Sequence, residues 1–219
     1  HNLMVIQKHR TFYKNLLMEF KTVFFRALEP EDAELIYKWK NDHEMMKDAV
    51  GMARPWSMQD CRNWVEARTK HDPFNYWFAI CLNDGSGRMI GYTGVNSIHY
   101  VNSSATCDAI VIGDKECRDG ISWLETNLFI REFVFEHLHL NRYYGCFSET
   151  QRLTAIANKL FHSTVEGISR QAIWSKGEYH DVYMVATLKE EYFAHKSNGD
   201  YVLTILIKRL RQLIKEERG

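Results

Sequence analysis

The chain has 219 residues, of which 45% are hydrophobic and 13% aromatic, which is enough apolar material for one α/β core plus extensions. Its 28 basic and 28 acidic residues cancel, so no global field recruits nucleic acid or an anionic membrane, and no apolar run approaches the roughly 20 residues of a membrane span. Five cysteines without a Cys-x-x-Cys pair exclude a disulfide framework or a zinc site, so we expect a soluble protein of the reducing cytoplasm.

The N-terminal part of the chain begins with an extension over residues 1–21, to which we assign no function. Residues 22–28 predict a strand, because β-branched and aromatic residues dominate the run Thr-Val-Phe-Phe-Arg-Ala-Leu. Residues 29–32 bring a proline and three acids, which suit the first turn of a helix that continues to about Asp42.

Residues 41–55 show no clear periodicity and contain a glycine and a proline, so we expect a loop or a broken helix near an acceptor site. Ser57 and Asp60 then form the start of a capping box. The pair predicts a helix that carries Cys61, Trp64 and Val65.

Two strands are predicted next, over residues 76–82 and 89–98. The sequence Asn-Asp-Gly-Ser-Gly at 83–87 is a strong turn signal, so the two strands should pair in an antiparallel hairpin.

The segment from Ser104 to Leu138 has the most informative pattern in the sequence, a strand, a turn and a helix. Residues 105–112 are small or β-branched and predict a buried strand that Gly113 ends. Apolar residues then recur at steps of three and four over 123–138, which predicts a helix. The turn at 117–122 leaves unpaired N–H groups at the positive end of that helix, so it is able to hold a phosphate.

A strand, a helix and two more strands are predicted after Leu138. We expect a strand over 143–147, then a helix to Leu160 that is capped by Ser148 or Thr150. Strands over 168–174 and 182–188 come next.

A last amphipathic helix is predicted beyond Gly199, within residues 194–219. We expect its apolar side to pack on the chain's own surface, and a homodimer contact is the alternative.

Within the segment 104–138, the spacing of Gly113, Gly120 and Ser122 is informative. A strand ends in Ile112-Gly113, six residues follow, and Gly120-x-Ser122 opens a helix. This arrangement resembles the acyl-CoA-binding segment of the GNAT superfamily of N-acetyltransferases, whose loop reads Gln/Arg-x-x-Gly-x-Gly/Ala. Here Cys117 stands at the first position of that loop, which departs from the family pattern.

Two further segments resemble the ribosomal-protein and polyamine acetyltransferase branch of this superfamily. One is the opening Arg-x-Leu-x-x-x-Asp-Ala-x-x-Ile-x-x-Trp from Arg26 to Trp39, and the other is the final hairpin over 165–171 and 176–182. The resemblances together cover residues 22–193. They imply a mixed α/β fold in which a central, mostly antiparallel, V-splayed sheet of about seven strands is flanked by helices.

The resemblance also implies acetyl-CoA as co-substrate, held largely by main-chain groups. N–H groups of 110–112 would face the pantetheine and thioester, and those of 118–123 the pyrophosphate. The Arg118 side chain either adds a contact to phosphate or faces solvent. The implied cofactor-binding residues are Ile110, Val111, Ile112, Cys117, Arg118, Asp119, Gly120, Ile121, Ser122, Trp123 and Thr150.

The candidate base is Asp108, on the central strand where many relatives carry glutamate. An unpaired carboxylate is costly to bury, so Asp108 should face a cleft or a partner, where it accepts the proton directly, acts through water or binds the amine. His99, at the end of the neighbouring strand, is the alternative base or a surface histidine.

The sequence departs most from the family pattern at the positions of the general acid. The usual tyrosine falls at Ala157, the usual strand-end asparagine at Thr150, and the serine that some members use at Leu153. Thr154 or Ser148 would then protonate the leaving thiolate, or the thiolate would leave unassisted.

Tyr179 and His180, in the hairpin motif, would support the wall of the acceptor site. The resemblance implies an N-acetyltransferase that uses acetyl-CoA and a primary amine of a small molecule, sugar, polyamine or protein N-terminus. The substituted motif positions favour the rival hypothesis, a non-catalytic CoA-binding or protein-binding module. A nucleic-acid-binding protein is disfavoured, because basic residues do not cluster outside the last helix.

Overall fold

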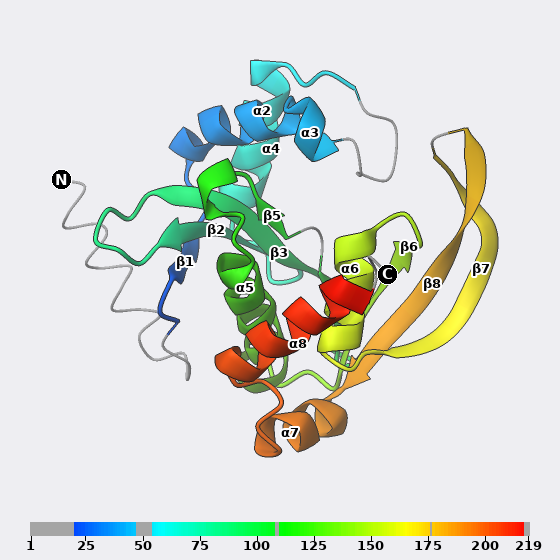
Figure 1. Ribbon diagram of the computed structural model, residues 1–219. Helices are drawn as coiled ribbons and strands as arrows, with labels where there is room; N and C mark the ends of the chain where they lie inside the picture. The colour runs from blue at the N-terminus through cyan, green and yellow to red at the C-terminus, as the bar shows by residue number, and fades with distance from the viewer. Residues whose placement is uncertain (1–19, 47–53, 108–109, 176, 217–219) are drawn as a thin grey trace.

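The computed structural model describes residues 20–46, 54–107, 110–175 and 177–216 (Figure 1). Its centre is one eight-stranded sheet in the order β1-β2-β3-β4-β6-β8-β7, with β5 beside β3. Neighbouring strands are antiparallel except for β4 and β6, which are parallel. The predicted mixed α/β fold with a mostly antiparallel sheet is confirmed.

The strands are β1 (Val23–Ala27), β2 (Tyr76–Leu82), β3 (Met89–His99), β4 (Ser104–Cys107), β5 (Val111–Ile112), β6 (Arg142–Ser148), β7 (Thr164–Ser175) and β8 (Glu178–Leu188). The helices are η1 (Pro30–Asp32), α2 (Ala33–Lys40), α3 (His43–Met46), α4 (Met58–Thr69), η2 (Lys115–Cys117), α5 (Ile121–Glu132), α6 (Arg152–Leu160), α7 (Lys189–Ser197) and α8 (Leu203–Glu216). A π-helical turn, η3 (Phe133–His137), continues α5, so the helix predicted over 123–138 is confirmed.

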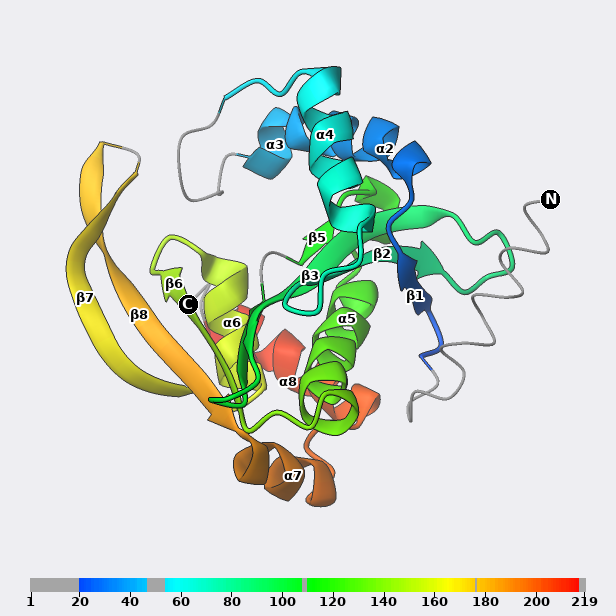
Figure 2. The ribbon, with the colours of Figure 1, turned by 180° about the vertical axis from the view of Figure 1, so that it is seen from behind.

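Helices cover both faces of the sheet, and the two-residue period of its strands supplies a core for each face. On β2, Phe78 and Ile80 belong to the core that α5 covers, whereas Ala79 and Cys81 belong to the core beneath α2 and α4. Figure 2 shows α4 on the near side of the sheet, opposite the side that α8 occupies. The two faces of the sheet therefore have separate hydrophobic cores.

A buried carboxylate joins α5 to β1. Glu125 is 1% exposed and accepts hydrogen bonds from the N–H groups of Lys21, Thr22 and Val23 at 3.1, 2.9 and 3.0 Å. Burial raises the pKa of Glu125 against the opposing effect of these bonds. The contacts fix α5 against the edge strand of the sheet.

The predicted cap of α4 is confirmed. Ser57 Oγ accepts from the N–H of Asp60 at 3.0 Å, and Asp60 Oδ2 accepts from the N–H of Ser57 at 3.4 Å. The broken helix expected within 41–55 is present as the short α3, while residues 47–53 and the extension at 1–19 lie outside the described residues.

The cap predicted for α6 is wrong. Its N-cap residue is Gln151, and neither Ser148 nor Thr150 caps it, because the chain makes a further turn after β6. In that turn Gln151 Oε1 accepts from the Ser148 N–H at 2.9 Å, and the Gln151 N–H donates to the Ser148 carbonyl at 2.8 Å.

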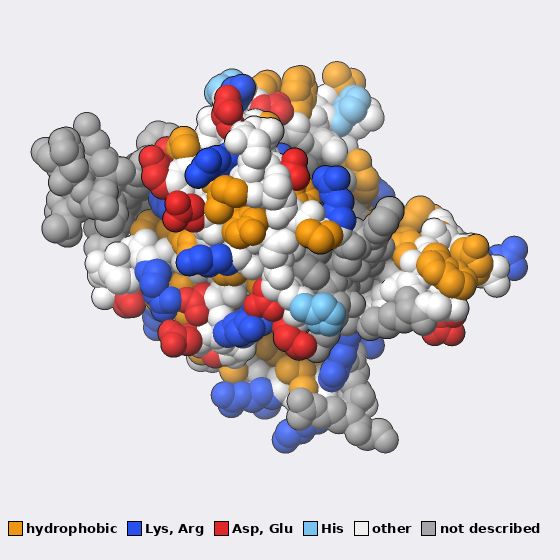
Figure 3. Space-filling model, turned by 90° about the horizontal axis from the view of Figure 1, so that it is seen from above, with side chains coloured by type: hydrophobic (Ala, Val, Ile, Leu, Met, Phe, Trp, Pro, Cys, Tyr) orange, Lys and Arg blue, Asp and Glu red, His pale blue; other side chains and the backbone are white. Residues whose placement is uncertain are grey.

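The C-terminal third extends the sheet and then returns to it. The β7–β8 hairpin projects from the body with hydrophobic side chains along it (Figure 3). Among these, Ile168, Trp174 and Tyr179 are each more than half exposed. The helix α7, which was not predicted, leads back to α8, and α8 lies across α5 and α6 (Figure 1). Leu206 of α8 is fully buried, so α8 packs on its own chain as expected.

All five cysteines are free, and no helix in the described ranges is both long and apolar enough to cross a membrane.

Candidate functional site

The parallel strands at the centre of the sheet, β4 and β6, pair over only part of their length. The last pair between β4 and β6 is Thr106 with Tyr144. Beyond it β5 pairs only with β3, while β6 continues to Ser148 beside β8 alone. Among the described strands, the facing edges of β5 and the end of β6 thus have no strand partner. Main-chain groups on such edges are available to a ligand.

The single buried strand predicted over 105–112 is not what the structure shows. It is divided into β4 and β5, and Ile110, Val111 and Ile112 are half-buried. The chain packs tightly just after β5, because a Cβ on Gly113 would lie 2.1 Å from the Trp39 ring. The end of β5 therefore lies directly against Trp39.

The turn after β5 is held by contacts with distant segments. Arg88, immediately before β3, pairs with Asp114 and lies 4.0 Å from the Sγ of Cys117. Lys115 pairs with Asp42 at 3.0 Å. Burial raises the pKa of the Cys117 thiol. Cys117 is thus a packed part of the turn, at the position where the family loop carries Gln or Arg.

The start of α5 offers main-chain donors. Gly120 is its N-cap residue, with a left-handed φ of +88° that suits glycine. Asp119 Oδ1 accepts from the Ile121 N–H at 2.9 Å. The N–H groups of Ser122 and Trp123, in the first turn, have no acceptor within the helix, and they lie at its positive end. This turn has the chemistry of an anion site.

Arg118 stabilises the same turn through the main chain. Its Nε donates to the Ile112 carbonyl at 3.0 Å and its Nη2 to the Gly113 carbonyl at 3.1 Å. The side chain is exposed, as one of the two expectations has it, and these two bonds direct its guanidinium group to main-chain carbonyls. Arg118 links the end of β5 to the entrance of α5.

Hydroxyl groups gather at the end of β6, across from β5. Ser148 is fully buried, and Thr150 Oγ1 lies 3.2 Å from its Oγ. Between them Glu149 Oε1 lies 3.0 Å from Nδ1 of His180 on β8, whose Nε2 lies 3.1 Å from the Ser175 carbonyl oxygen. The hairpin is thereby fixed to the turn that borders the separation of the strands.

This contact predicts a pH dependence. The hydrogen bond to Glu149 raises the pKa of His180 above its ordinary value of 6.5. Because the folded-state pKa is the higher one, the contact stabilises the hairpin below the unfolded-state pKa, and this contribution is lost as pH rises through the folded-state value. An NMR titration of the His180 ring should give a midpoint above 6.5, and Glu149→Gln should lower it. A midpoint at or below 6.5 in the parent would contradict this assignment.

The other candidate catalytic residues do not gather at this place. His99 is exposed at the far end of β3, where Nδ1 accepts from the Asn102 N–H at 3.0 Å. It lies opposite Ser104, about 10 Å along β4 from Cys107 at the usual rise per residue. Thr154 is exposed in the first turn of α6, and Asp108 lies outside the described residues. The structure brings Ser148 and Thr150 together, and it places His99 apart.

A polar cavity lies across the sheet from α5, which sequence reasoning missed. It has a volume of about 360 Å³ between α4 and the central strands. Its wall includes Arg68, Asp72, Trp77, Asn96 and Thr106. Thr106 belongs to β4, so this cavity reaches the strand beside the separation from the face opposite α5. The lining residues come from α4, the connection to β2 and the strands β2, β3 and β4, and only the fold brings these segments together.

Residues 22–160 match the family model described as "Acetyltransferase (GNAT) domain". Among solved structures, spermidine N-acetyltransferase from Vibrio cholerae in complex with CoA and spermine is similar, with a TM-score of 0.67 and 20% identity over 78% of this chain and 98% of that chain. A GCN5-related N-acetyltransferase from Brucella melitensis has a TM-score of 0.68 and 19% identity over 84% of each chain. Identities this low show a shared fold. A comparison with curated proteins finds no match.

Proposed function

Because the chain belongs to the GNAT acetyltransferase domain family, we propose that it moves an acetyl group from acetyl-CoA to a primary amine of a small molecule or a protein N-terminus. One observation carries the proposal. The parallel strands β4 and β6 are paired only as far as Thr106 and Tyr144, and β5 and β6 then separate beside the start of α5. We call this separation, from β5 to the end of β6, the acyl-CoA groove.

Acetyl-CoA, the co-substrate of this family, supplies an acyl thioester and a chain that ends in phosphates. The residues present suit both parts. The open edge of β5 offers main-chain groups to the amide-containing arm, and the first turn of α5 offers donors to phosphate. We propose that Ile110, Val111 and Ile112 line the arm and that 118–123 hold the pyrophosphate.

The acceptor would approach from the opposite face, where the polar cavity reaches β4. In the transfer, the amine nitrogen forms a bond to the acyl carbon, the thiolate leaves, and the nitrogen gives up a proton. We propose Asp108 as the group that accepts this proton. We propose Ser148 and Thr150, joined at the end of β6, as the hydroxyls that protonate the leaving thiolate, ahead of the exposed Thr154.

We further propose that the chain belongs to the ribosomal-protein and polyamine acetyltransferase branch of the family. The sequence of the final hairpin supports it, and so does the presence of a spermidine N-acetyltransferase among the similar folds. That protein acts on a polyamine. For this chain a polyamine is one candidate acceptor among several amines.

A second candidate function is that of a non-catalytic CoA-binding or protein-binding module. Three positions favour it: Cys117 packs beside Arg88 in the turn, Ala157 is buried in α6 where the family has its tyrosine, and Thr150 replaces the strand-end asparagine.

Release of free CoA separates the two functions. The full chain is incubated with acetyl-CoA and, in parallel, with polyamines, amino sugars or peptides that have free N-termini. We expect thiol release that depends on one of these amines. Binding of acetyl-CoA without release in any mixture would favour the CoA-binding module. Absence of binding would contradict the acetyltransferase and leave the protein-binding module.

A further inference from the structure

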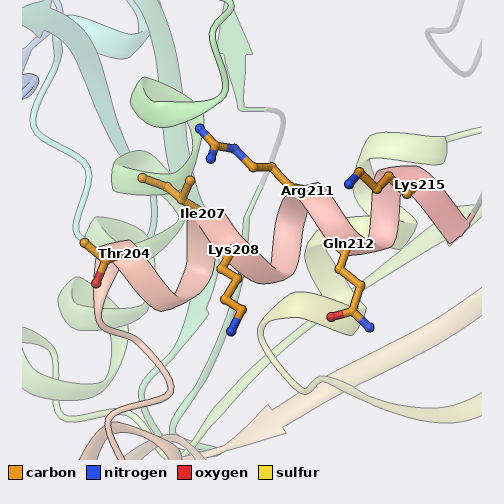
Figure 4. Close-up of a pocket in the computed structure, with 6 residues that line it drawn as sticks. All are labelled: Thr204, Ile207, Lys208, Arg211, Gln212 and Lys215. Carbon is orange, nitrogen blue, oxygen red and sulfur yellow. The ribbon is translucent and has the colours of Figure 1, made fainter.

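A cationic groove runs along the outward side of α8, with a volume of about 380 Å³ (Figure 4). Its walls are the side chains of Thr204, Ile207, Lys208, Arg211, Gln212 and Lys215. The three cations fall within about two helical turns. Within the described part of the chain, Lys208, Arg211 and Lys215 have neither an ion pair nor a side-chain hydrogen bond. Their charge is therefore available to a ligand.

The charge of α8 is local and unbalanced. The protein carries equal numbers of basic and acidic residues, yet α8 has four basic residues and one acid, Glu216. A concentration of one sign on a neutral protein attracts ligands of the opposite sign to that place.

The helix lies against the start of α5. Leu210 Cδ2 is 3.4 Å from the position that a Cβ on Gly120 would occupy. Ile207 and Leu210 pack on the same hydrophobic cluster as Ile112 and Trp123. In Figure 4 the Arg211 side chain extends to the same side of α8 as Ile207, whereas Lys208 and Gln212 extend to the other side. Arg211, on the same side of α8 as Ile207, thus extends towards the anion site at the start of α5, and Lys215 follows one helical turn later.

Contacts at the N-terminal part of α8 fix its position. Leu206 is fully buried, and the Tyr201 hydroxyl donates to the Phe161 carbonyl at 3.3 Å. Arg209 Nη2 lies 2.7 Å from Nε2 of His162. Little main-chain freedom remains to be lost when a ligand binds the side chains of this helix, which favours affinity.

We propose that Arg211 and Lys215 bind the phosphate groups of the CoA moiety. The inference rests on the proposed function and adds to it, because α8 lies outside the residues 22–160 that match the family. The chemistry is a charge-assisted one: guanidinium and ammonium groups on a fixed helix beside main-chain donors, facing a ligand with several phosphates.

The test is calorimetric titration of the full chain with CoA. Arg211→Gln with Lys215→Gln should weaken CoA binding tenfold or more, since two charge-assisted contacts are lost. The matched control, Lys38→Gln with Arg62→Gln, removes the same two charges from exposed positions on α2 and α4 across the sheet, and it should bind like the parent. S-acetylpantetheine lacks phosphate, so its binding should be equal in parent and variant.

Three results of the titration would contradict the inference or the proposed function. If the parent binds CoA and the α8 variant binds it equally well or more tightly, the inference fails while the proposed function stands. Equal weakening in the α8 variant and in the control would mean a general charge effect, which also overturns it. If the parent does not bind CoA, the proposed function itself fails.

Discussion

Gly120→Trp abolishes acetyl-CoA binding, with an expected loss of affinity of at least about 100-fold, a size typical of a lost set of pre-organised contacts. The left-handed φ of +88° is strained for any residue other than glycine. An indole would also enter the space beside Leu210, where the turn must stay open for the pyrophosphate. Calorimetry with acetyl-CoA measures the loss, and thermal unfolding confirms that the variant is folded.

Gly85→Trp is the control for strain. Gly85 has a φ of +96° in the β2–β3 turn, and nothing lies within 4 Å of the position that its Cβ would take. It should therefore incur similar strain and keep acetyl-CoA affinity. If Gly120→Trp binds acetyl-CoA like the parent, the assignment of this turn to the pyrophosphate is wrong.

Asp108→Asn slows acetyl transfer by about 100-fold or more and leaves acetyl-CoA affinity within a few fold, as expected for loss of a general base. An amide cannot accept the proton that the amine gives up, yet it keeps the size of the carboxylate. The rate of CoA release at saturating acceptor measures the effect across pH. Asp84→Asn, in the β2–β3 turn, is the matched control and should transfer like the parent. Transfer by Asp108→Asn at the parent rate would remove Asp108 from the chemistry.

Local signals predicted much of this fold. The capping box at Ser57 and Asp60, the turn at 83–87 and the apolar periodicity of α5 each act within a few residues, so their meaning is independent of the rest of the chain. The main-chain donors at the start of α5 were predictable for the same reason, since they follow from the geometry of a helix end.

Features that depend on distant contacts were not predictable. Gly113 packs against the ring of Trp39, and Cys117 lies beside Arg88, 29 residues away. The position of α8 depends on contacts such as that of Arg209 with His162. A helical period shows that α8 has an apolar side and does not show which surface receives it.

Hydrogen exchange of the full chain with and without acetyl-CoA tests the acyl-CoA groove most directly. Main-chain N–H groups that bind a ligand exchange more slowly, because their opening then requires the ligand to leave. We predict slower exchange at 110–123 and at 147–152 when acetyl-CoA is present, with the outer part of the β7–β8 hairpin unchanged. Protection confined to other segments, or no protection at saturating acetyl-CoA, would contradict the placement of acyl-CoA between β5 and β6.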